Sequence, residues 1–354
     1  MEFLYDYGLF IAKAFTLVFF FAAAVFVLAA VRSKSSGAVS RGYLEITRLN
    51  DQYDDMSESV MLATLNEAEQ KVQMKKLEET RKGKHKADKK AAKKVTDDHT
   101  PLRRVYVLNF DGNVSASAVE HLREEITAVL SQAKESDEVV LKLESAGGMV
   151  HSYGLAASQL DRLRKRNIPL TVCVDKVAAS GGYMMACVAD KILAAPFAVL
   201  GSIGVVAQLP NFNRLLKKHQ VDFELLTAGE YKRTLTVFGE NTDSAREKFV
   251  EELEETHQLF KNYVSERRPA VDIAGVATGE VWYGSRALEV ALVDDLQTSD
   301  EYVSNCIEDA EVFEINYVLK KSLTERIGLA AETGADRLLL KWWLRLTGDA
   351  HKLP

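Results

Sequence analysis

The sequence has few cysteines and no excess of positive charge, and each shortage excludes a class of protein. Its three cysteines are too few for a disulfide framework and lack metal-ligand spacing, so we expect neither a disulfide scaffold nor a metal site. Lys and Arg number 45 against 51 Asp and Glu, a net charge of -6. This balance argues against a global attraction to nucleic acid.

The remaining composition is that of a globular protein with specialised ends. Of 354 residues, 47% are apolar and 27% charged, which excludes a wholly disordered chain and a polytopic membrane protein. At roughly 150 residues per domain the length allows about two domains, and the polar or membrane-directed segments reduce this towards one large domain. We divide the chain into an anchor (1–31), a charged helical or linker pre-domain (32–100), a folded α/β domain (101–320) and an amphipathic tail (321–354).

The first thirty residues contain a long apolar run. Residues 14–31 carry no charge, and extension back to residue 9 gives about 23 residues, or ~34 Å of helix against a hydrocarbon core of ~30 Å. A cleaved signal peptide would have a basic leader, whereas Glu2 and Asp6 precede this run. We therefore predict an uncleaved, single-pass membrane anchor at residues 9–31, with lipid as its partner.

The pre-domain combines a helical pattern with a lysine-rich tract. Apolar residues at helical spacing from Met61 to Val72 predict a long amphipathic helix through about Lys76. Residues 71–94 then hold eleven basic residues against three acids. Such a tract could bind nucleic acid or anionic lipid, but no aromatic side chains interleave it, which favours a solvated, self-repelling linker.

After Pro101 the pattern alternates between strands and helices. Strands are predicted at residues 105–110, 138–143, 169–174 and 191–195, helices at 119–129, 153–163 and 244–264, and the segments 203–207, 212–218 and 223–226 continue the alternation. This order predicts βαβ-type units and a sheet covered by helices.

One glycine-rich junction follows the second predicted strand of the body. In residues 144–148 (ESAGG) two glycines allow a tight turn before a helix, which leaves backbone N–H groups free for an oxyanion or a phosphate. No GxxxxGK[ST] or GxGxxG pattern surrounds it, so a nucleotide site is weakly supported. Taken alone, this junction is best interpreted as a structural turn.

A second junction, residues 178–183 (AASGGY), places a serine at a helix start. Small residues surround Ser180, as a nucleophile requires if a carbonyl group is to approach it. The competing interpretation is a serine N-cap without chemistry, which on cap frequency alone is favoured.

A nucleophilic serine needs a base. Of seven histidines His151 alone lies near a glycine junction, so a Ser-His-Asp triad rests on one weak candidate. A lysine can serve when desolvation lowers its pKa from ~10.4 towards neutrality. Lys232 follows a strand-like segment and opens a loop, although an ordinary surface lysine is the default interpretation.

Five motifs taken together resemble a known family. They are residues 144–148 (ESAGG), 178–183 (AASGGY), 200–205 (LGSIGV), 229–232 (GEYK) and 287–294 (ALEVALVD). In this order, between residues 105 and 296, they resemble the SppA/SohB family of membrane-anchored serine peptidases of the signal peptide peptidase type. The resemblance is closest to the SohB branch, which has one anchor, a charged pre-domain and a single catalytic repeat.

The resemblance implies a role for each matching residue. Ser180 would be the nucleophile and Lys232 its general base, in a Ser-Lys dyad that needs no cofactor and no metal. Ser202 would hydrogen-bond the lysine amine. The backbone N–H groups of Gly147 or Gly148, and of Gly181, would form the oxyanion hole. The family's frequent Ser-Pro-Gly-Gly is here Ser-Ala-Gly-Gly, which keeps the donors and makes the turn less rigid.

The resemblance also implies a fold, an assembly and a substrate class. The fold is α/β, a ClpP/crotonase-like spiral of ββα units behind one N-terminal transmembrane helix, and the domain at 101–320 would be the serine peptidase domain. A ring-like homo-oligomer is expected, with a dyad that neighbouring subunits can share. Peptide substrates would be apolar, such as signal-peptide remnants or membrane-protein fragments, and no nucleic acid is expected.

The positive-inside rule and the family resemblance predict opposite sides of the bacterial inner membrane for the folded domain. More Lys and Arg follow the anchor than precede it, which places the body in the cytoplasm. The better-studied family members act outside the cytoplasm, so the resemblance implies the periplasm.

Other functions share parts of this pattern. A histidine-based ClpP-like peptidase needs a histidine soon after Ser180, and residues 181–218 contain none. A crotonase-like acyl-CoA enzyme would require neither Ser180 nor Lys232, and a catalytically silent membrane scaffold would recruit partners through the basic tract. In the tail, a stripe formed by Leu339, Trp342, Trp343 and Leu346 predicts equally a helix at the membrane interface or one packed on protein.

Overall fold

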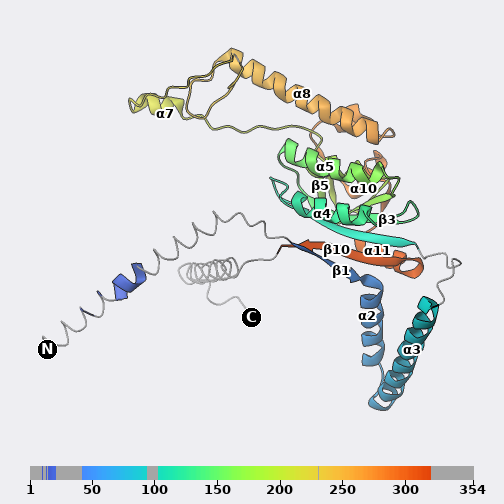
Figure 1. Ribbon diagram of the computed structural model, residues 1–354. Coiled ribbons are helices and arrows are strands. Elements are labelled where there is room, and N and C mark those ends of the chain that lie inside the picture. Colours follow the sequence, from blue (N-terminus) through green and yellow to red (C-terminus); the bar gives the residue numbers. More distant parts are fainter. Residues whose placement is uncertain are drawn as a thin grey trace. The chain divides into compact units, whose positions relative to one another are not determined.

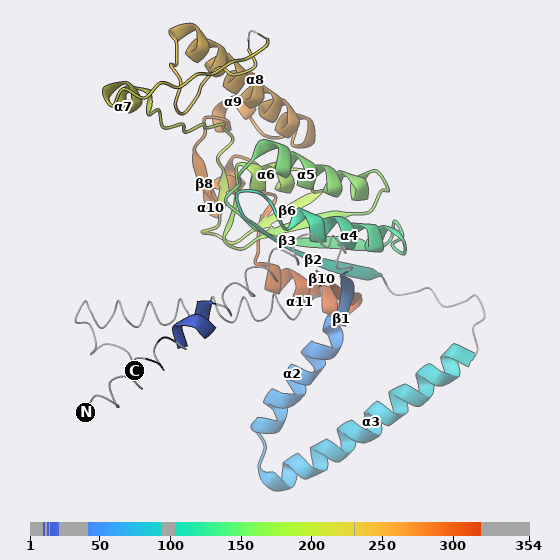
Figure 2. The ribbon, with the colours of Figure 1, turned by 60° about the vertical axis from the view of Figure 1, so that its left-hand side comes forward.

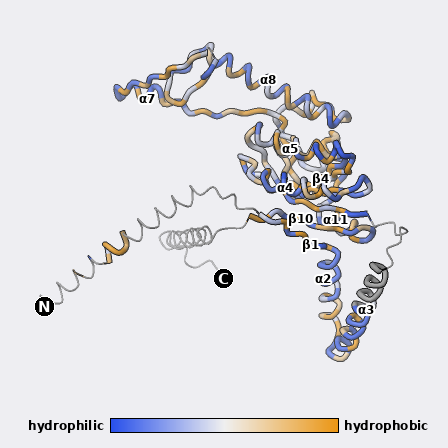
Figure 3. Tube along the Cα trace, in the orientation of Figure 1, coloured by the Kyte–Doolittle hydropathy of each residue, from blue (hydrophilic) through white to orange (hydrophobic). Residues whose placement is uncertain are grey.

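The computed structural model describes residues 42–93, 103–229 and 231–319, together with Phe10, Lys13 and residues 15–20 (Figure 1). The chain divides into two units, one of residues 44–317 and one of residues 1–43 with 318–354. Residues 15–20 are helical and strongly apolar (Figure 3). No helix within the described residues is both long and apolar enough to cross a bilayer. Most of the predicted anchor and the whole predicted tail lie outside the described residues.

A sheet of ten strands lies at the centre of the described chain. The strands are β1 (Tyr43–Arg48), β2 (Arg104–Gly112), β3 (Glu138–Ser145), β4 (Leu170–Val174), β5 (Val177–Ala179), β6 (Lys191–Ala194), β7 (Val199–Gly201), β8 (Val281–Tyr283), β9 (Asp295–Leu296) and β10 (Glu311–Val318). The main order is β1-β10-β2-β3-β4-β6-β9, and a branch runs from β3 through β5 and β7 to β8. The branch pairs are parallel except β7 with β8. The predicted α/β class is confirmed.

Helices cover both faces of this sheet (Figures 1 and 2). The helices of the described residues are α2 (Leu49–Ala63), α3 (Glu67–Lys93), α4 (Val119–Leu130), α5 (Val150–Arg164), α6 (Gly181–Ala186), α7 (Asn213–Lys218), α8 (Asp243–Arg267), α9 (Ile273–Val276), α10 (Gly284–Glu289) and α11 (Ser299–Asp309), and those that cover the sheet include α4, α5 and α11. In β2, Tyr106 and Leu108 join the core beneath α4 and α5, while Val105 and Val107 join a second core beneath α11. Alternate residues of the strand therefore serve opposite faces, and both faces are buried.

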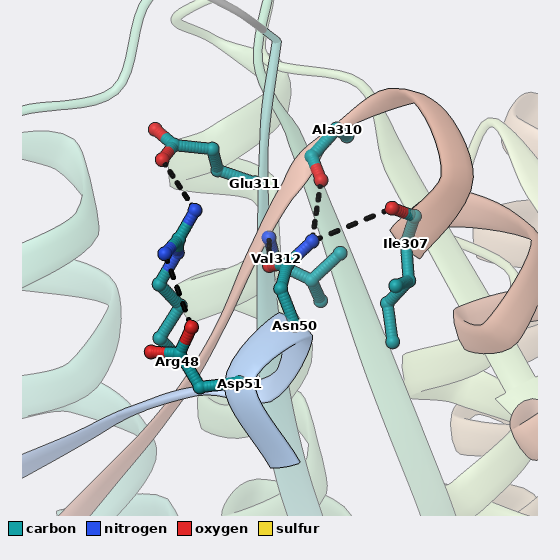
Figure 4. A network of polar contacts seen from close by, with 7 residues as sticks. All are labelled: Arg48, Asn50, Asp51, Ile307, Ala310, Glu311 and Val312. Carbon is teal, nitrogen blue, oxygen red and sulfur yellow. Dashed lines mark hydrogen bonds and ion pairs between the residues drawn. The ribbon is translucent and has the colours of Figure 1, made fainter. Parts of the chain in front are cut away.

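The start of α2 is hydrogen-bonded to residues 310–312 at the start of β10, a contact that sequence patterns did not reveal. Asn50 donates its amide to the carbonyl of Ala310 (2.9 Å) and accepts the N–H of Val312 (2.9 Å) (Figure 4). Arg48 adds an ion pair with Glu311 (3.1 Å). Because β1 lies beside β10 at the sheet edge, the Asn50 side chain pairs backbone groups that the edge would otherwise leave open.

The long helix predicted through Lys76 is interrupted. The chain turns between α2 and α3, and Asn66 starts the second helix by accepting the N–H groups of Ala68 and Glu69. The Glu69 carboxylate in turn accepts the N–H of Asn66 (3.2 Å). This reciprocal capping box is a stronger local signal than the apolar spacing that continues across it. The lysine-rich tract is helical through Lys93, within the range predicted as a charged helical or linker pre-domain.

The alternation predicted between residues 203 and 226 is not present. Residues 203–207 and 223–226 are irregular, and the segment between them holds only the short helix α7. Their apolar residues instead form local ring contacts, such as Phe212 and Phe223 with Phe238 at centroid distances of 6.1 and 5.8 Å. Apolar runs of four or five residues do not by themselves distinguish a strand from an irregular segment.

Candidate active site

Parallel pairing aligns three of the glycine-rich junctions. Ser145 of β3 lies opposite Ala178 of β5, and Ala179 of β5 lies opposite Gly201 of β7. The turns that follow the three strands therefore lie side by side. The backbone N–H of Ser180 donates to the Gly201 carbonyl (2.8 Å), which ties the second turn to the third. The tertiary structure thus gathers motifs that are separated by up to about sixty residues.

Ser180 occupies a strained backbone conformation between β5 and α6. Its φ is 51° and its ψ -119°, in a region that residues with a side chain seldom adopt. The side chain makes no capping hydrogen bond to α6. A serine that serves only as an N-cap has an extended backbone and accepts an N–H of the first turn, so the cap interpretation does not describe this residue. A sharp, strained strand-to-helix turn is instead typical of an exposed nucleophile.

The glycines beside Ser180 are required by close packing. A Cβ atom on Gly147, whose φ is +91°, would lie 2.7 Å from the Ser180 Cβ. On Gly148 it would lie 2.1 Å from the Val114 carbonyl oxygen, and on Gly181 it would lie 2.3 Å from the Tyr153 ring. A side chain at any of these positions would force the neighbouring atoms to move.

The two turns differ in which N–H groups remain available. The Gly147 N–H donates to the Ser145 hydroxyl (3.1 Å). Those of Gly148 and Gly181 donate to no acceptor within the described residues. Both glycines line a cavity of about 20 Å³ with Ser180, which has room for about one water molecule. This arrangement leaves two backbone donors beside one hydroxyl.

Apolar side chains and a helix that the sequence argument did not consider complete this cavity. Its further walls are Val150, Met184, Gly204, Val205, Thr256 and Phe260. The last two come from α8, which His257 ties to the Ile203 carbonyl (3.2 Å). The amphipathic pattern of α8 predicted that it would dock, but only the tertiary structure shows that it docks at the cavity.

Of the other predicted residues, Ser202 lies in the turn beside Ser180, whereas Lys232 and His151 do not line the cavity. Lys232 is exposed, does not line the cavity, and makes no side-chain hydrogen bond or ion pair among the described residues. Ser202 lies at φ 50° in the third turn, and its backbone N–H donates to the Glu280 carbonyl (2.7 Å). His151 is exposed in the first turn of α5. One chain therefore brings together Ser180, Ser202 and the glycine turns, but not Lys232.

The segment around Lys232 is bonded locally and leaves the lysine side chain exposed. Residues 211–242 bond mainly among themselves, as in the Asn213 amide to the Phe238 carbonyl (2.9 Å) and the ion pair of Lys217 with Glu240 (2.7 Å). Phe238, which follows Lys232 closely, is 44% exposed. A lysine base needs a desolvated amine, and the exposed Lys232 of a single chain does not have one among the described residues.

The last motif of the resemblance has a structural task. Asp294 accepts two hydrogen bonds from the buried guanidinium of Arg268, at 2.7 and 2.9 Å, and one from the Ile192 N–H (2.7 Å). Arg268 lies at the end of α8, and Arg267 beside it pairs with Asp161 of α5 (2.9 Å). This motif therefore holds α8, and with it one wall of the cavity, against the sheet.

Comparison with known proteins identifies the family. The model described as "Peptidase family S49 N-terminal" matches residues 2–160, and that described as "Peptidase family S49" matches residues 162–313. The chain belongs to peptidase family S49. Its mixed α/β architecture with a central sheet fits the ClpP-like fold of that family.

Individual relatives agree with this assignment. The chain is 48% identical to a protein of Haemophilus influenzae named "Probable protease SohB", over 98% of each chain. It is 51% identical to a protein of the same name from Buchnera aphidicola subsp. Schlechtendalia chinensis, over 86% of this chain and 99% of the relative. Similarity to "Protease 4" of Haemophilus influenzae is lower, 26% over 71% of this chain and 43% of that protein. Peptide-bond hydrolysis is therefore the general activity that the family supports.

Proposed function

We propose that this chain is a membrane-anchored serine endopeptidase in which Ser180 attacks the scissile carbonyl and Lys232 acts as the general base. The observation that carries the proposal is the strained, uncapped Ser180 beside the free N–H groups of Gly148 and Gly181. A hydroxyl and two backbone donors around one small cavity is the arrangement that acyl transfer needs.

In the proposed reaction each group has one task. Neutral Lys232 takes the Ser180 proton as the hydroxyl oxygen forms a bond to the carbonyl carbon. The carbonyl oxygen becomes an oxyanion that the Gly148 and Gly181 N–H groups stabilise, and the lysine then returns the proton to the departing amine. Water hydrolyses the resulting acyl-enzyme by the same route in reverse. Gly148 is favoured over Gly147 as a donor because the Gly147 N–H already donates to Ser145.

We propose that Lys232 reaches Ser180 of a neighbouring subunit in a homo-oligomer, where Ser202 would accept a hydrogen bond from its amine. Two features support this. Lys232 is exposed, and the contacts of its segment are largely local, so a second copy can take it up without breaking the fold. Docking between subunits would also remove water from the amine, as a lysine base requires.

Mixing two inactive variants tests both the dyad and its location. Ser180→Ala and Lys232→Ala should each abolish cleavage of an apolar peptide, while Arg233→Ala, the exposed basic neighbour, should retain it. Oligomers reassembled from both inactive variants should recover activity, because some sites then combine an intact serine with an intact lysine. Retained activity in Lys232→Ala would refute the dyad and favour His151, and a mixture that stays inactive would refute sharing between subunits.

The walls of the cavity support apolar peptide substrates. Val150, Met184, Val205 and Phe260 offer no charged partner to a side chain beside the scissile bond. Short extended segments, such as signal-peptide remnants or fragments of membrane proteins, fit a site tethered at a bilayer. Cleavage of folded soluble proteins as fast as of apolar peptides would contradict this part of the proposal.

The anchor and its orientation belong to the same proposal. The apolar run at residues 9–31 supports a single span in a bacterial inner membrane, and the basic residues after it support a cytoplasmic body. Protease protection in intact spheroplasts distinguishes the two sides, since a periplasmic body would be digested without lysis.

A further inference from the structure

Tyr153 of α5 contacts both turns that carry the free backbone donors. The side chain is fully buried, with 0% exposure, and is among the largest completely buried side chains of the core. The sequence alone does not indicate a role for Tyr153, because a tyrosine on a helix face is ordinarily explained by packing alone.

The Tyr153 hydroxyl belongs to a chain of hydrogen bonds that ends at the first turn. It lies 2.8 Å from the Asn113 carbonyl oxygen, to which it can donate, and 2.5 Å from the Ser145 hydroxyl. Ser145 in turn accepts the Gly147 N–H (3.1 Å). When Ser145 donates to Tyr153, Tyr153 donates to Asn113; when Ser145 donates to the Gly112 carbonyl (3.2 Å), Tyr153 donates to Ser145. In both arrangements the Ser145 oxygen accepts the Gly147 N–H. The Tyr153 hydroxyl thereby helps to fix a turn in which the Gly147 N–H is bonded to Ser145 and the Gly148 N–H stays free.

The Tyr153 ring contacts the second turn directly. A Cβ atom on Gly181 would lie 2.3 Å from the ring Cγ and 2.6 Å from its Cδ2, so the ring packs against the backbone at the first residue of α6. That residue carries the other free N–H and follows Ser180. A single rigid side chain therefore spans the distance between the two donors.

We propose that Tyr153 is a positioning residue that holds the Gly148 and Gly181 N–H groups at the separation an oxyanion requires. This role rests on the proposed serine peptidase function. Its hydroxyl acts on the 145–148 turn through Ser145, and its ring acts on the start of α6. Oxyanion donors act strongly only when they are fixed before the charge develops, so loosening one turn weakens the transition state more than the bound substrate.

Tyr183 provides a matched control. It is also fully buried, and its hydroxyl donates to the backbone carbonyl of Leu292 at the same distance, 2.8 Å. Tyr153→Phe and Tyr183→Phe therefore each remove one buried hydroxyl bonded to a carbonyl. Only the first removal reaches the glycine turn.

The test compares the two variants in the full-length protein with an apolar peptide and with a peptide aldehyde. The aldehyde carbon bonds to the Ser180 oxygen, and the former carbonyl oxygen then lies at the oxyanion position. Tyr153→Phe should lower kcat about tenfold with KM changed less than twofold, and should weaken aldehyde inhibition by a similar factor. Inhibition by a non-covalent product peptide should be unaffected, and Tyr183→Phe should alter each value less than twofold.

Several outcomes would overturn the role of Tyr153. They are equal losses of kcat in both variants, no loss in Tyr153→Phe, or a rise in KM alone. Should Tyr153→Phe not fold, Ser145→Ala replaces it, because that change breaks the same chain of hydrogen bonds and carries the same expectation. Labelling with a fluorophosphonate probe distinguishes failure of the proposed serine peptidase function from failure of the Tyr153 proposal. A wild-type protein whose Ser180 is not labelled fails as a serine peptidase, whereas labelled, active wild type with a fully active Tyr153→Phe refutes only the positioning role.

Discussion

At the scale of single residues, the site depends on positions where no side chain fits. Gly148 approaches the Val114 backbone so closely that a methyl group would lie 2.1 Å from the carbonyl oxygen. The contact is with backbone, which cannot rotate away as a flexible side chain can. The glycine is therefore needed for the closeness of the turn to its neighbour, independently of its φ angle.

Substitution of two glycines by alanine tests this explanation. Gly148→Ala should lower the free energy of unfolding by about 1–3 kcal/mol through overpacking, and should reduce peptide cleavage more than tenfold by displacing a donor. Gly154→Ala, six residues along in α5, has nothing within 4 Å of the added atom. It should raise the free energy of unfolding by about 0.5–1 kcal/mol, because glycine is unfavourable inside a helix. Chemical denaturation and peptide assays measure both, and equal stability of the two variants would refute the packing argument.

The proposed dyad predicts non-additive kinetics. Ser180→Ala and Lys232→Ala should each reduce kcat by a similar factor, since neither group acts without the other. The double variant should then be little worse than either single variant. If the two losses instead multiply, Ser180 and Lys232 act independently and the dyad is wrong.

At the scale of elements, α8 forms one wall of the cavity and is held to the rest of the fold at its end. Its middle supplies Thr256 and Phe260 to the cavity, and its end is held by Arg268. The Arg268 side chain is only 9% exposed, and Asp294 is its bidentate partner. Loss of the partner would leave a buried guanidinium without its counter-charge, a situation that is costly in proteins.

Asp294→Ala should therefore destabilise the protein by about 3 kcal/mol or more and lower activity by releasing α8. The control is Arg286→Ala, which breaks an exposed ion pair with Glu289 and should change the free energy of unfolding by less than about 0.5 kcal/mol. Hydrogen exchange should show earlier exchange of the α8 amides in Asp294→Ala alone. Normal protection of α8 in that variant would show that other contacts hold the helix.

At the scale of the whole molecule, one buried carboxyl group links stability to pH. Glu125 of α4 is 4% exposed, one of its oxygens accepts the Tyr317 N–H of β10 (2.8 Å), and the other has no hydrogen-bond partner among the residues that the structure describes. Burial raises the pKa of Glu125 from 4.5 to about 7, and the Tyr317 hydrogen bond offsets this only in part. Between these values the folded protein holds a proton that the unfolded chain releases, so its stability falls as pH rises through that range and is constant above it.

Glu125→Gln should remove this dependence. Relative to wild type, the variant should gain about 3 kcal/mol of unfolding free energy between pH 4.5 and pH 8. Glu124→Gln, the exposed neighbour on the same helix, should follow the wild-type curve. Urea denaturation across this pH range measures all three proteins. A Glu125→Gln curve parallel to wild type would mean that the carboxyl is ionised in the folded state at low pH as well.

Much of this fold could be predicted from local pattern. The strands β2, β3, β4 and β6 and the helices α4, α5 and α8 were predicted within a few residues, because long apolar periodicities and glycine boundaries mark them. The break before α3 was missed, although Asn66 and Glu69 form a readable capping box. Strand β1 and its Asn50 contact were also missed, since pairing at a sheet edge depends on a partner some 260 residues away.

The sequence by itself determined the chemistry that is available. It contains a serine between small residues, glycine turns, a lysine in a loop and His151 as a weak alternative base. Five motifs in order resembled the peptidase family that the comparisons confirm. The sequence also determined that β3 and β5 end in tight turns. These properties are local, because a turn or a helix start is set by a few adjacent residues.

The tertiary structure decided which of these parts act together. The register of β3, β5 and β7 placed Gly147 against Ser180 and left Lys232 apart, and no local pattern encodes a register between distant strands. The burial of Tyr153 between two turns assigned the Gly147 N–H to Ser145 and left that of Gly148 free. Which strands pair and which hydrogen bonds form depend on all the groups that surround each position. Those groups are brought together only when the chain has folded.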